Sequence, residues 1–374
     1  MKCPYCNSDL TFPYYDVKMP NILAACPEEM HQKVKTFPIR AELCTACGLG
    51  FNAARLDDEE LKFIYDNYCY ISPLHAIGTS KYEGMLSTLQ KYCSKKDKLV
   101  EIGCSEGYLL LLLKENGYEN LTGIEPGPQA DSARRNGINV IKDYFTQKTF
   151  FRDTVNAFFL MHVYEHLENP FELLDIMQSQ LSRRGKIILE VPNFTGYHHQ
   201  HLYYFSAPFL ARMSKDKNLK IVELFEDSEV LRVVFVKITN QDYPEITRNF
   251  DKDLVIERAH KMQKDFQDKI KQIEQLFRTS HTNKIYWWGA GSASTILLNQ
   301  LDPDLLEQYK IAVIDSDPKK QGLLIPGTNL QVGGFTNIKG QVVENLVIAS
   351  SFHNEIQETM KKYNISTKNT LVVF

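Results

Sequence analysis

The sequence lacks any apolar run that approaches the roughly 20 residues of a membrane-spanning helix, and its first residues lack the apolar core of a signal peptide. It also lacks an excess of either charge, since 43 Lys and Arg stand against 46 Asp and Glu. These acids and bases are mixed along the chain, so we expect no basic surface for a nucleic-acid backbone. Together these absences predict a cytoplasmic protein that has neither a membrane nor a nucleic acid as its partner.

Cysteine is sparse, but four of the eight cysteines form two Cys-x-x-Cys pairs, Cys3/Cys6 and Cys44/Cys47. In a reducing compartment, such pairs favour metal binding or redox chemistry over disulfides. Four thiolates complete a tetrahedral site, which selects zinc and leaves no open position for a substrate. We therefore predict a structural zinc ion on these four residues. A thioredoxin-like redox pair is the alternative, but no βαβ pattern surrounds either pair. We expect the unpaired Cys26 to be a small buried side chain.

A strand followed by a glycine turn and a helix is predicted near residue 100. The apolar residues 98–102 lead into Gly103-x-x-x-Gly107, and a helix is expected over residues 108–116. A second strand, residues 121–124, ends at Glu125. In an α/β sheet, a carboxylate in that position accepts hydrogen bonds from ribose hydroxyls. This order of elements predicts an α/β fold that binds a nucleotide cofactor.

The spacing of Glu101 and Gly103 resembles the first motif of class I S-adenosylmethionine methyltransferases, in which an acidic residue stands two positions before the first glycine. A dehydrogenase would show Gly-x-Gly-x-x-Gly, and a purely structural turn is the remaining alternative. Residues 141–144 and 158–167 match the family segments that contact adenine and lie beside the methionine moiety. The resemblance implies that S-adenosylmethionine binds to Glu101, Gly103, Ser105, Gly107, Glu125, Pro126, Asp143, Tyr144, His162 and His166.

Residues 196–206 hold three histidines and three tyrosines immediately after a predicted strand. Histidine can take a proton near neutral pH, and tyrosine can donate to a developing oxyanion. Methylation of a carbon atom needs both functions. A base removes the proton next to a carbonyl, donors hold the enolate, and the enolate attacks the sulfonium methyl group. The segment therefore predicts a catalytic site.

Residues 198–206 resemble the active-site segment of sugar C-methyltransferases, which usually reads Tyr-His-Glu-His-x-x-Tyr-Phe-Ser. The resemblance assigns His201 as the general base. Here His198 replaces the family tyrosine and Gln200 replaces the carboxylate, so either His198 acts as acid or oxyanion donor, or the reaction is O-methylation. Residues 64–72 match a family segment over the active site, which makes Tyr68 and Tyr70 candidates to close on the substrate or to pack between domains.

The last third of the sequence repeats the same order of elements. A long helix is expected over residues 253–277, followed by a strand at 284–288, a glycine turn, and a strand at 311–314 that ends in an acid. Residues 315–328 and 347–351 resemble the C-terminal domain of the same sugar methyltransferases, which helps to hold the nucleotide sugar. The resemblance implies substrate-binding residues, although the turn could also be purely structural. They are Gly289, Gly291, Ser292, Asp315 and Lys320.

These observations predict an α/β protein with a class I methyltransferase core. We expect a zinc-binding domain at residues 1–72, a methyltransferase domain at 73–245, a helical linker at 246–282 and a Rossmann-like substrate-binding domain at 283–374. The predicted activity is transfer of a methyl group from S-adenosylmethionine to a carbon of a nucleotide-linked keto sugar. The alternatives are an O- or N-methyltransferase that acts on a sugar or another small molecule with a histidine base, and a non-catalytic binding protein that keeps the cofactor fold. The dense cluster of histidine and tyrosine argues against the latter. The partner is a small molecule, and the sequence is compatible with a monomer.

Overall fold

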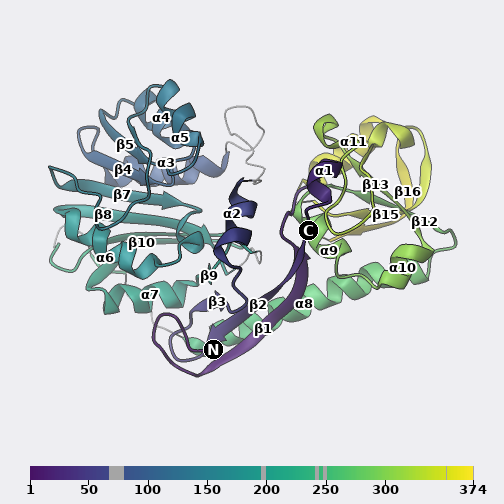
Figure 1. Cartoon of the computed structure of the whole chain (residues 1–374), viewed down its shortest axis with the longest axis horizontal. Coiled ribbons are helices and arrows are strands. Elements are labelled where there is room, and N and C mark those ends of the chain that lie inside the picture. Colours follow the sequence, from purple (N-terminus) through teal and green to yellow (C-terminus); the bar gives the residue numbers. More distant parts are fainter. Residues whose placement is uncertain (67–79, 195–198, 241–243, 247–250, 351, 374) are drawn as a thin grey trace. The chain divides into compact units, whose positions relative to one another are not determined.

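The computed structural model describes residues 1–66, 80–194, 199–240, 244–246, 251–350 and 352–373 (Figure 1). The chain divides into two compact units. The first comprises residues 1–12, 42–52 and 70–256, and the second comprises residues 13–41, 53–69 and 257–374. The domain boundaries expected from the sequence stay a prediction.

A seven-stranded sheet forms the centre of the first unit, with the strand order β10-β11-β8-β7-β4-β5-β6 (Figure 1). The five strands from β6 to β8 are parallel, whereas β11 runs antiparallel to both β8 and β10. Parallel strands place their carboxyl ends at one edge, where α/β sheets bind ligands. The strands are β4 (Lys98–Ile102), β5 (Asn120–Ile124), β6 (Val140–Ile141), β7 (Val155–Met161), β8 (Leu181–Pro192), β10 (Leu219–Glu226) and β11 (Val230–Lys237).

Helices pack on this sheet because each carries an apolar stripe. In α4, for example, Leu109, Leu110 and Leu113 are buried in a core that also includes Phe159 of β7. Glu106 and Gly107 lead directly into α4, so the glycine turn is fixed between the helix and the end of β4. The helices of the unit are α3 (Ser80–Tyr92), α4 (Tyr108–Glu115), α5 (Gln129–Arg135), the short η1 (Tyr164–His166), α6 (Pro170–Gln180) and α7 (Ala207–Asp216).

A smaller sheet has the order β1-β2-β3-β9 and consists of β1 (Thr11–Pro20), β2 (Thr36–Cys44), β3 (Gly50–Asn52) and β9 (Tyr203–Tyr204). Strands β3 and β9 pair antiparallel, with Gly50 opposite Tyr204. A Cβ atom on Gly50 would lie 2.9 Å from both Phe194 and Tyr204, so only glycine lets the two strands approach. The sheet therefore ties the histidine-rich segment to the strand that follows the second cysteine pair.

The second unit contains a five-stranded parallel sheet with the order β14-β13-β12-β15-β16 (Figure 1). Its strands are β12 (Lys284–Trp288), β13 (Lys310–Asp315), β14 (Gly333–Gly334), β15 (Val342–Ile348) and β16 (Ser366–Val372). Its helices are α1 (Glu28–His31), α2 (Asp58–Asp66), α9 (Ser292–Leu298), α10 (Pro303–Gln308), η2 (Pro318–Lys320), η3 (Phe335–Ile338) and α11 (His353–Lys362). The long helix α8 (Lys252–Arg278) confirms the predicted connecting helix.

The predicted fold class is confirmed, since the first unit has a largely parallel α/β sheet, the second has a parallel one, and the cysteine pairs accompany the small sheet. Strands β4, β5, β12 and β13 lie where the sequence predicts them, within one residue at most of their ends. Cys26 is buried, as expected. In the described part of the chain, none of the helices has the length and apolarity to span a membrane.

Candidate functional site

The glycine turn after β4 has a left-handed backbone at Gly103, Ser105 and Gly107, with φ angles of +75°, +48° and +76°. Besides its left-handed backbone, position 103 has no room for a side chain. A Cβ atom there would lie 2.5 Å from a methyl group of Val163. The amide of Gly103 donates to the carbonyl oxygen of Ile124, which fixes the turn beside the end of β5. The turn thus exposes backbone close to the carboxyl edge, where a nucleotide cofactor can approach.

Glu125 bridges the turn and the residues after β5. Its Oε2 accepts a hydrogen bond from the amide of Ser105 at 3.0 Å, and its Oε1 accepts one from the amide of Gly127 at 2.7 Å. A carboxylate offers about four acceptor positions, so each oxygen keeps one position for a further donor. The side chain is half-buried, which leaves those positions within reach of a ligand's hydroxyl groups.

Glu101 lies near the carboxyl end of β4, at the same edge of the sheet, and is only 5% exposed. Its Oε2 atom is buried and has no hydrogen-bond partner among the residues that the structure describes. Burial raises the pKa of this carboxyl group well above its usual range, and the nearby Glu125 raises it further. A buried carboxyl oxygen without a donor is costly unless a ligand or water supplies one.

The segment expected to contact adenine follows β6 at the same edge. Asp143 accepts a hydrogen bond from the amide of Tyr144 at 2.7 Å, and the Tyr144 side chain is 69% exposed. Pro126 is exposed as well. The structure therefore brings the predicted adenine and ribose residues to one edge of the sheet, with an aromatic ring open to solvent.

Three imidazole rings gather around Glu165 where β7 and β8 end. The atoms closest to Glu165 Oε1 are His162 Nδ1 at 3.6 Å, His201 Nε2 at 3.8 Å and His166 Nε2 at 3.9 Å. The rings of His166 and His201 are 4.6 Å apart between centroids. Glu165 is 1% exposed, and Glu190, beside His162, forms an ion pair with Arg232. The cluster thus combines buried carboxylates with partly exposed imidazoles at the edge that carries the glycine turn.

Sequence reasoning missed Glu165 and Glu190 as members of this cluster. Glu165 stands between two predicted site histidines, so its position in the sequence was the available signal. Of the residues assigned to catalysis, the structure places His201 in the cluster. His198, Tyr68 and Tyr70 lie outside the described residues.

Residues 78–224 match the family model of a methyltransferase domain. This stretch is a class I methyltransferase domain. The match contains the glycine turn, Glu125 and the histidine cluster, so it covers the part of the chain for which the sequence predicts S-adenosylmethionine chemistry.

Individual relatives are distant. The chain is similar to a tRNA U34 carboxymethyltransferase of Sulfurimonas denitrificans, with 27% identity over an alignment of 114 residues. The match covers 27% of this chain and 37% of the relative. Among solved structures, a magnesium protoporphyrin IX methyltransferase of Synechocystis with bound SAM shows 13% identity and a TM-score of 0.39 over 49% of this chain and 99% of its own. A SAM-dependent methyltransferase of Aquifex aeolicus shows 13% identity and a TM-score of 0.34 over 43% and 98%.

The four cysteines predicted to bind zinc lie outside residues 78–224, and their sulfur atoms lie close together. The Sγ atoms of Cys3 and Cys47 are 3.6 Å apart, and those of Cys6 and Cys44 are also 3.6 Å apart. All four sulfur atoms lie within 4.8 Å of one another. Zinc–sulfur bonds of about 2.3 Å in a tetrahedron place sulfur atoms about 3.8 Å apart. The four residues fit a zinc ion, which would hold the two turns together and have a structural role.

The glycine turn of the second unit resembles that of the methyltransferase domain. Gly289 has a φ of +120°, and a Cβ atom there would lie 2.6 Å from the carbonyl oxygen of Ala349. Asp315 is 8% exposed and accepts hydrogen bonds from the amides of Ala290 and Asp317, each at 2.8 Å.

Three further residues predicted to bind the substrate lie around this turn. The ammonium group of Lys320 is 3.2 Å from Asp315 Oδ2. A Cβ atom on Gly291 would have no neighbour within 4 Å, and Ser292 begins α9.

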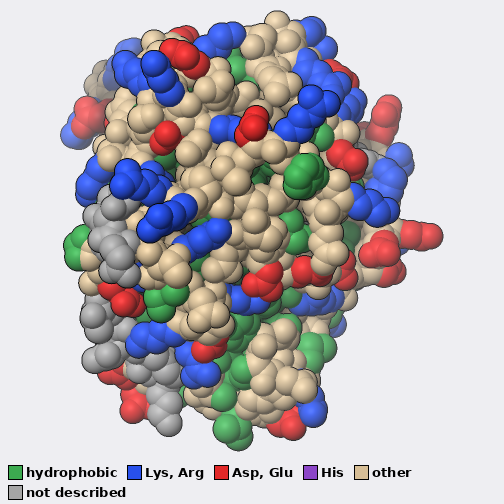
Figure 2. All heavy atoms as spheres, turned by 90° about the vertical axis from the view of Figure 1, so that its left-hand side faces the viewer, with side chains coloured by type: hydrophobic (Ala, Val, Ile, Leu, Met, Phe, Trp, Pro, Cys, Tyr) green, Lys and Arg blue, Asp and Glu red, His purple; other side chains and the backbone are tan. Residues whose placement is uncertain are grey.

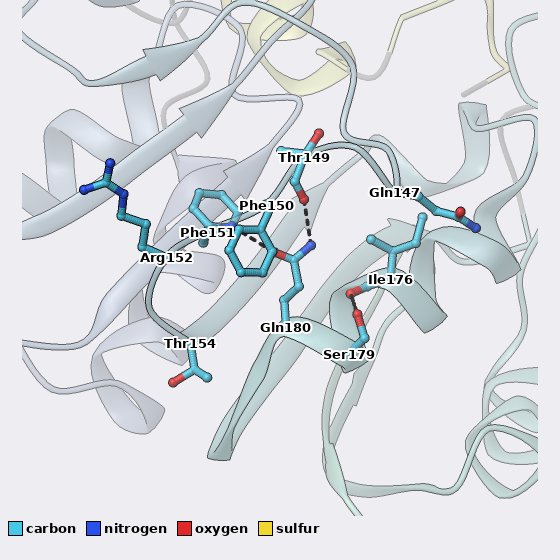
Figure 3. A pocket seen from close by; sticks show the side chains of 9 residues that line it. All are labelled: Gln147, Thr149, Phe150, Phe151, Arg152, Thr154, Ile176, Ser179 and Gln180. Carbon is cyan, nitrogen blue, oxygen red and sulfur yellow. Dashed lines mark hydrogen bonds between the residues drawn. The ribbon is translucent and has the colours of Figure 1, made fainter.

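A cavity of about 330 Å³ lies elsewhere on the methyltransferase domain (Figure 3). It is lined by residues that include Thr154, just before β7, and Gln180, at the end of α6. Gln180 accepts from the amide of Phe151 and donates to the carbonyl oxygen of Thr149, so it holds the loop beside the cavity (Figure 3). The cavity faces the amino end of β7, whereas ligands of parallel sheets bind at the carboxyl ends. It is therefore not part of the cofactor site.

Proposed function

We propose that the chain transfers the methyl group of S-adenosylmethionine to a carbon atom of a nucleotide-linked keto sugar. The observation that carries the proposal is the cluster of His162, His166 and His201 around the buried Glu165 at the carboxyl edge of the sheet. A carbon next to a carbonyl must lose a proton before it can accept a methyl group, and a cluster of imidazoles is suited to that step. A neutral amine acceptor, which already carries a lone pair, needs no such step.

The residues of the carboxyl edge fit the cofactor. The left-handed turn from Gly103 to Gly107 leaves room for close approach, Glu125 keeps acceptor positions for ribose hydroxyls, and Glu101 has a buried oxygen that lacks a donor. When bound, S-adenosylmethionine supplies an electrophilic methyl group. The chain has to orient the acceptor carbon towards that group and keep water out of the reaction.

In this proposal, the proton next to the sugar ketone leaves at the histidine cluster. The resemblance to sugar C-methyltransferases makes His201 the residue on which this step depends. His198, Tyr68 and Tyr70, which lie outside the described residues, would donate to the enolate oxygen. The second unit would hold the nucleotide part of the substrate through Gly291, Ser292 and Lys320, near the turn after β12.

On the face that Figure 2 displays, the charges favour a small-molecule substrate over RNA. The distant relative from Sulfurimonas acts on tRNA, as its name states. Figure 2, however, shows Lys and Arg side chains spread among Asp and Glu side chains on the face that it displays. Proteins that hold a nucleic-acid backbone instead gather positive charge into a patch or stripe.

O-methylation of a sugar or another small molecule is the second candidate. It is favoured by Gln200, which stands where sugar C-methyltransferases carry a carboxylate. The amide of Gln200 cannot take part in a proton relay as a carboxylate can. In this case, the histidine base would remove a proton from a hydroxyl group.

The test is incubation with nucleotide keto sugars in deuterated water, followed by NMR analysis of the product. We expect deuterium at the carbon next to the ketone and a new carbon–methyl bond. Because a positioned base contributes about 10²–10⁴-fold in rate, His201→Ala should lose that factor in turnover while S-adenosylmethionine binding, measured by calorimetry, stays unchanged. A methylated hydroxyl group without deuterium uptake would replace C-methylation with the second candidate.

A further inference from the structure

Glu165 is a buried carboxylate that lacks the donors such a group needs. It is 1% exposed, and both of its side-chain oxygens are buried without a hydrogen-bond partner among the described residues. An ionised carboxylate in such a place is strongly destabilising unless a cation or several donors compensate it. The surrounding side chains must therefore supply positive charge or bind something that does.

His166 cannot do this as a neutral ring. His166 Nδ1 lies 2.9 Å from the carbonyl oxygen of Gln200. A carbonyl oxygen only accepts hydrogen bonds, so Nδ1 carries the hydrogen and Nε2 of the neutral ring carries a lone pair. That lone pair lies 3.9 Å from Glu165 Oε1, and His201 Nε2 lies 3.8 Å from the same oxygen. A neutral His166 therefore presents its lone pair to a carboxylate oxygen, and two such acceptor atoms repel unless a proton or a metal ion lies between them.

The spacing fits a metal ion rather than a water molecule. Two ligand atoms bound to one ion at about 2.1 Å lie about 3.4 Å apart at a tetrahedral angle and about 4.2 Å apart when opposite. The distances from Glu165 Oε1 to His166 Nε2, 3.9 Å, and to His201 Nε2, 3.8 Å, fall in this range. Two groups bridged by a water molecule with hydrogen bonds of about 2.8 Å would lie about 4.5 Å apart or more. Single donor atoms from Glu165, His166 and His201 also lie within 4.8 Å of one another.

We propose that Glu165, His166 and His201 bind one divalent first-row metal ion, in addition to the ion of the cysteine cluster. Two imidazoles and one carboxylate are the ligand set of catalytic zinc and non-haem iron sites, and they leave coordination positions open. The bond from His166 to the Gln200 carbonyl is the kind of contact that orients metal-ligating histidines. The site thus differs from the four-cysteine cluster, which is closed.

This inference rests on the proposed function and adds a cofactor to it. The ion would hold the ketone oxygen of the sugar in an open position and act as a Lewis acid. Hydroxide on the ion takes the proton from the neighbouring carbon and becomes water. The electron pair of that carbon–hydrogen bond forms the enolate, whose oxygen stays on the ion and whose carbon takes the methyl group. In this form of the proposed function, the metal-bound hydroxide replaces the imidazole as the base and His201 serves as a ligand. The loss of turnover expected for His201→Ala would then come from loss of the ion.

The test counts the metal ions bound to the full-length chain after dialysis against Zn²⁺. We expect two ions for the wild type, one for Glu165→Gln and one for Cys44→Ser. Glu172→Gln, which changes an exposed carboxylate of α6, should keep two. His166→Gln provides a second variant in case Glu165→Gln does not fold, and thermal unfolding shows whether each variant is native. One ion in the wild type, or two in both folded site variants, would overturn the proposal.

Product analysis separates this inference from the proposed function. If the chain makes a carbon–methyl bond with only the cysteine-bound ion present, the proposed function stands and the second metal site is refuted. If two ions bind and a hydroxyl group is methylated, the metal site stands and C-methylation is refuted.

Discussion

The glycine turns of the two units share a hydrogen-bonding plan. In the methyltransferase domain, Glu125 accepts from an amide of the turn and from the amide two residues after itself. In the second unit, Asp315 accepts from Ala290 in the turn and from Asp317, which is also two residues further on. A carboxylate at the end of the second strand therefore stabilises the turn in both units, whether or not a ligand binds there.

The turns differ in what surrounds that carboxylate. Two residues before the first glycine, the methyltransferase domain has the buried acid Glu101, whereas the second unit has Trp287, whose indole N–H donates to Ser294 at 2.8 Å. Asp315 is more buried than Glu125 and lies beside Lys320. Beside the first turn, Glu101 has a buried oxygen without a donor among the described residues. Beside the second turn, Asp315 and Trp287 are both hydrogen-bonded. Unpaired polar groups, rather than the glycine pattern, distinguish a cofactor site from a structural turn.

The largest effect is expected from Gly289→Ala. The added Cβ would lie 2.6 Å from a backbone oxygen at a φ of +120°. Left-handed strain of about 1–2 kcal/mol and overpacking of about 1–3 kcal/mol should together lower the free energy of unfolding by about 2–5 kcal/mol. Gly291→Ala is the matched control, because its Cβ would meet nothing within 4 Å. Urea denaturation measures both. Equal stability of the two variants would show that the second turn is not rigidly packed.

The next effect concerns cofactor affinity. Glu125→Ala should weaken S-adenosylmethionine binding by about 1–3 kcal/mol, because ribose hydroxyls and the Ser105 amide lose their acceptor. Asp315→Ala removes the corresponding carboxylate of the second unit and should leave this affinity unchanged. Calorimetry measures the S-adenosylmethionine affinity of both variants. If Asp315→Ala weakened S-adenosylmethionine binding as much as Glu125→Ala, the proposed difference between the turns would be wrong.

The two glycine turns, their carboxylates and the cysteine pairs could be predicted from the sequence. Gly103, Glu125, Gly289 and Asp315 stand at short, fixed distances along the chain, and so do the cysteines of each pair. Such spacing reflects backbone geometry, which depends on neighbouring residues.

The histidine cluster could only be predicted in part. Glu165 lies beside His201, which is 36 residues away, only because η1 and the segment before β9 meet at the sheet edge. That meeting depends on the two-residue strand β9 and on the close approach at Gly50. A pairing this short has no periodicity that a sequence could display.

A third, smaller effect should appear in the pH dependence of stability. The pKa of Glu101 is raised by burial in the folded state, above the unfolded value of about 4.3. Between these two values the folded chain binds a proton that the unfolded chain has lost, so stability falls as pH rises, by up to about 1.4 kcal/mol for each pH unit. Glu101→Gln should remove this slope in the cofactor-free protein. Trp287→Phe in the second unit should leave the slope intact. Urea denaturation from pH 4 to pH 8 measures it, and parallel curves for Glu101→Gln and wild type would contradict the assignment.

The smallest effect is expected from Lys320→Met. Its ammonium group lies 3.2 Å from Asp315, but about a third of the side chain is exposed. Partly exposed ion pairs contribute about 1 kcal/mol or less, and salt screens them. The variant should therefore lose at most that much stability at low salt and approach the wild type at 1 M NaCl. Lys319→Met, at an exposed neighbouring position, serves as the control. If Lys320→Met instead leaves stability unchanged but weakens binding of a nucleotide sugar, Lys320 is a ligand group, as the proposed role of the second unit requires.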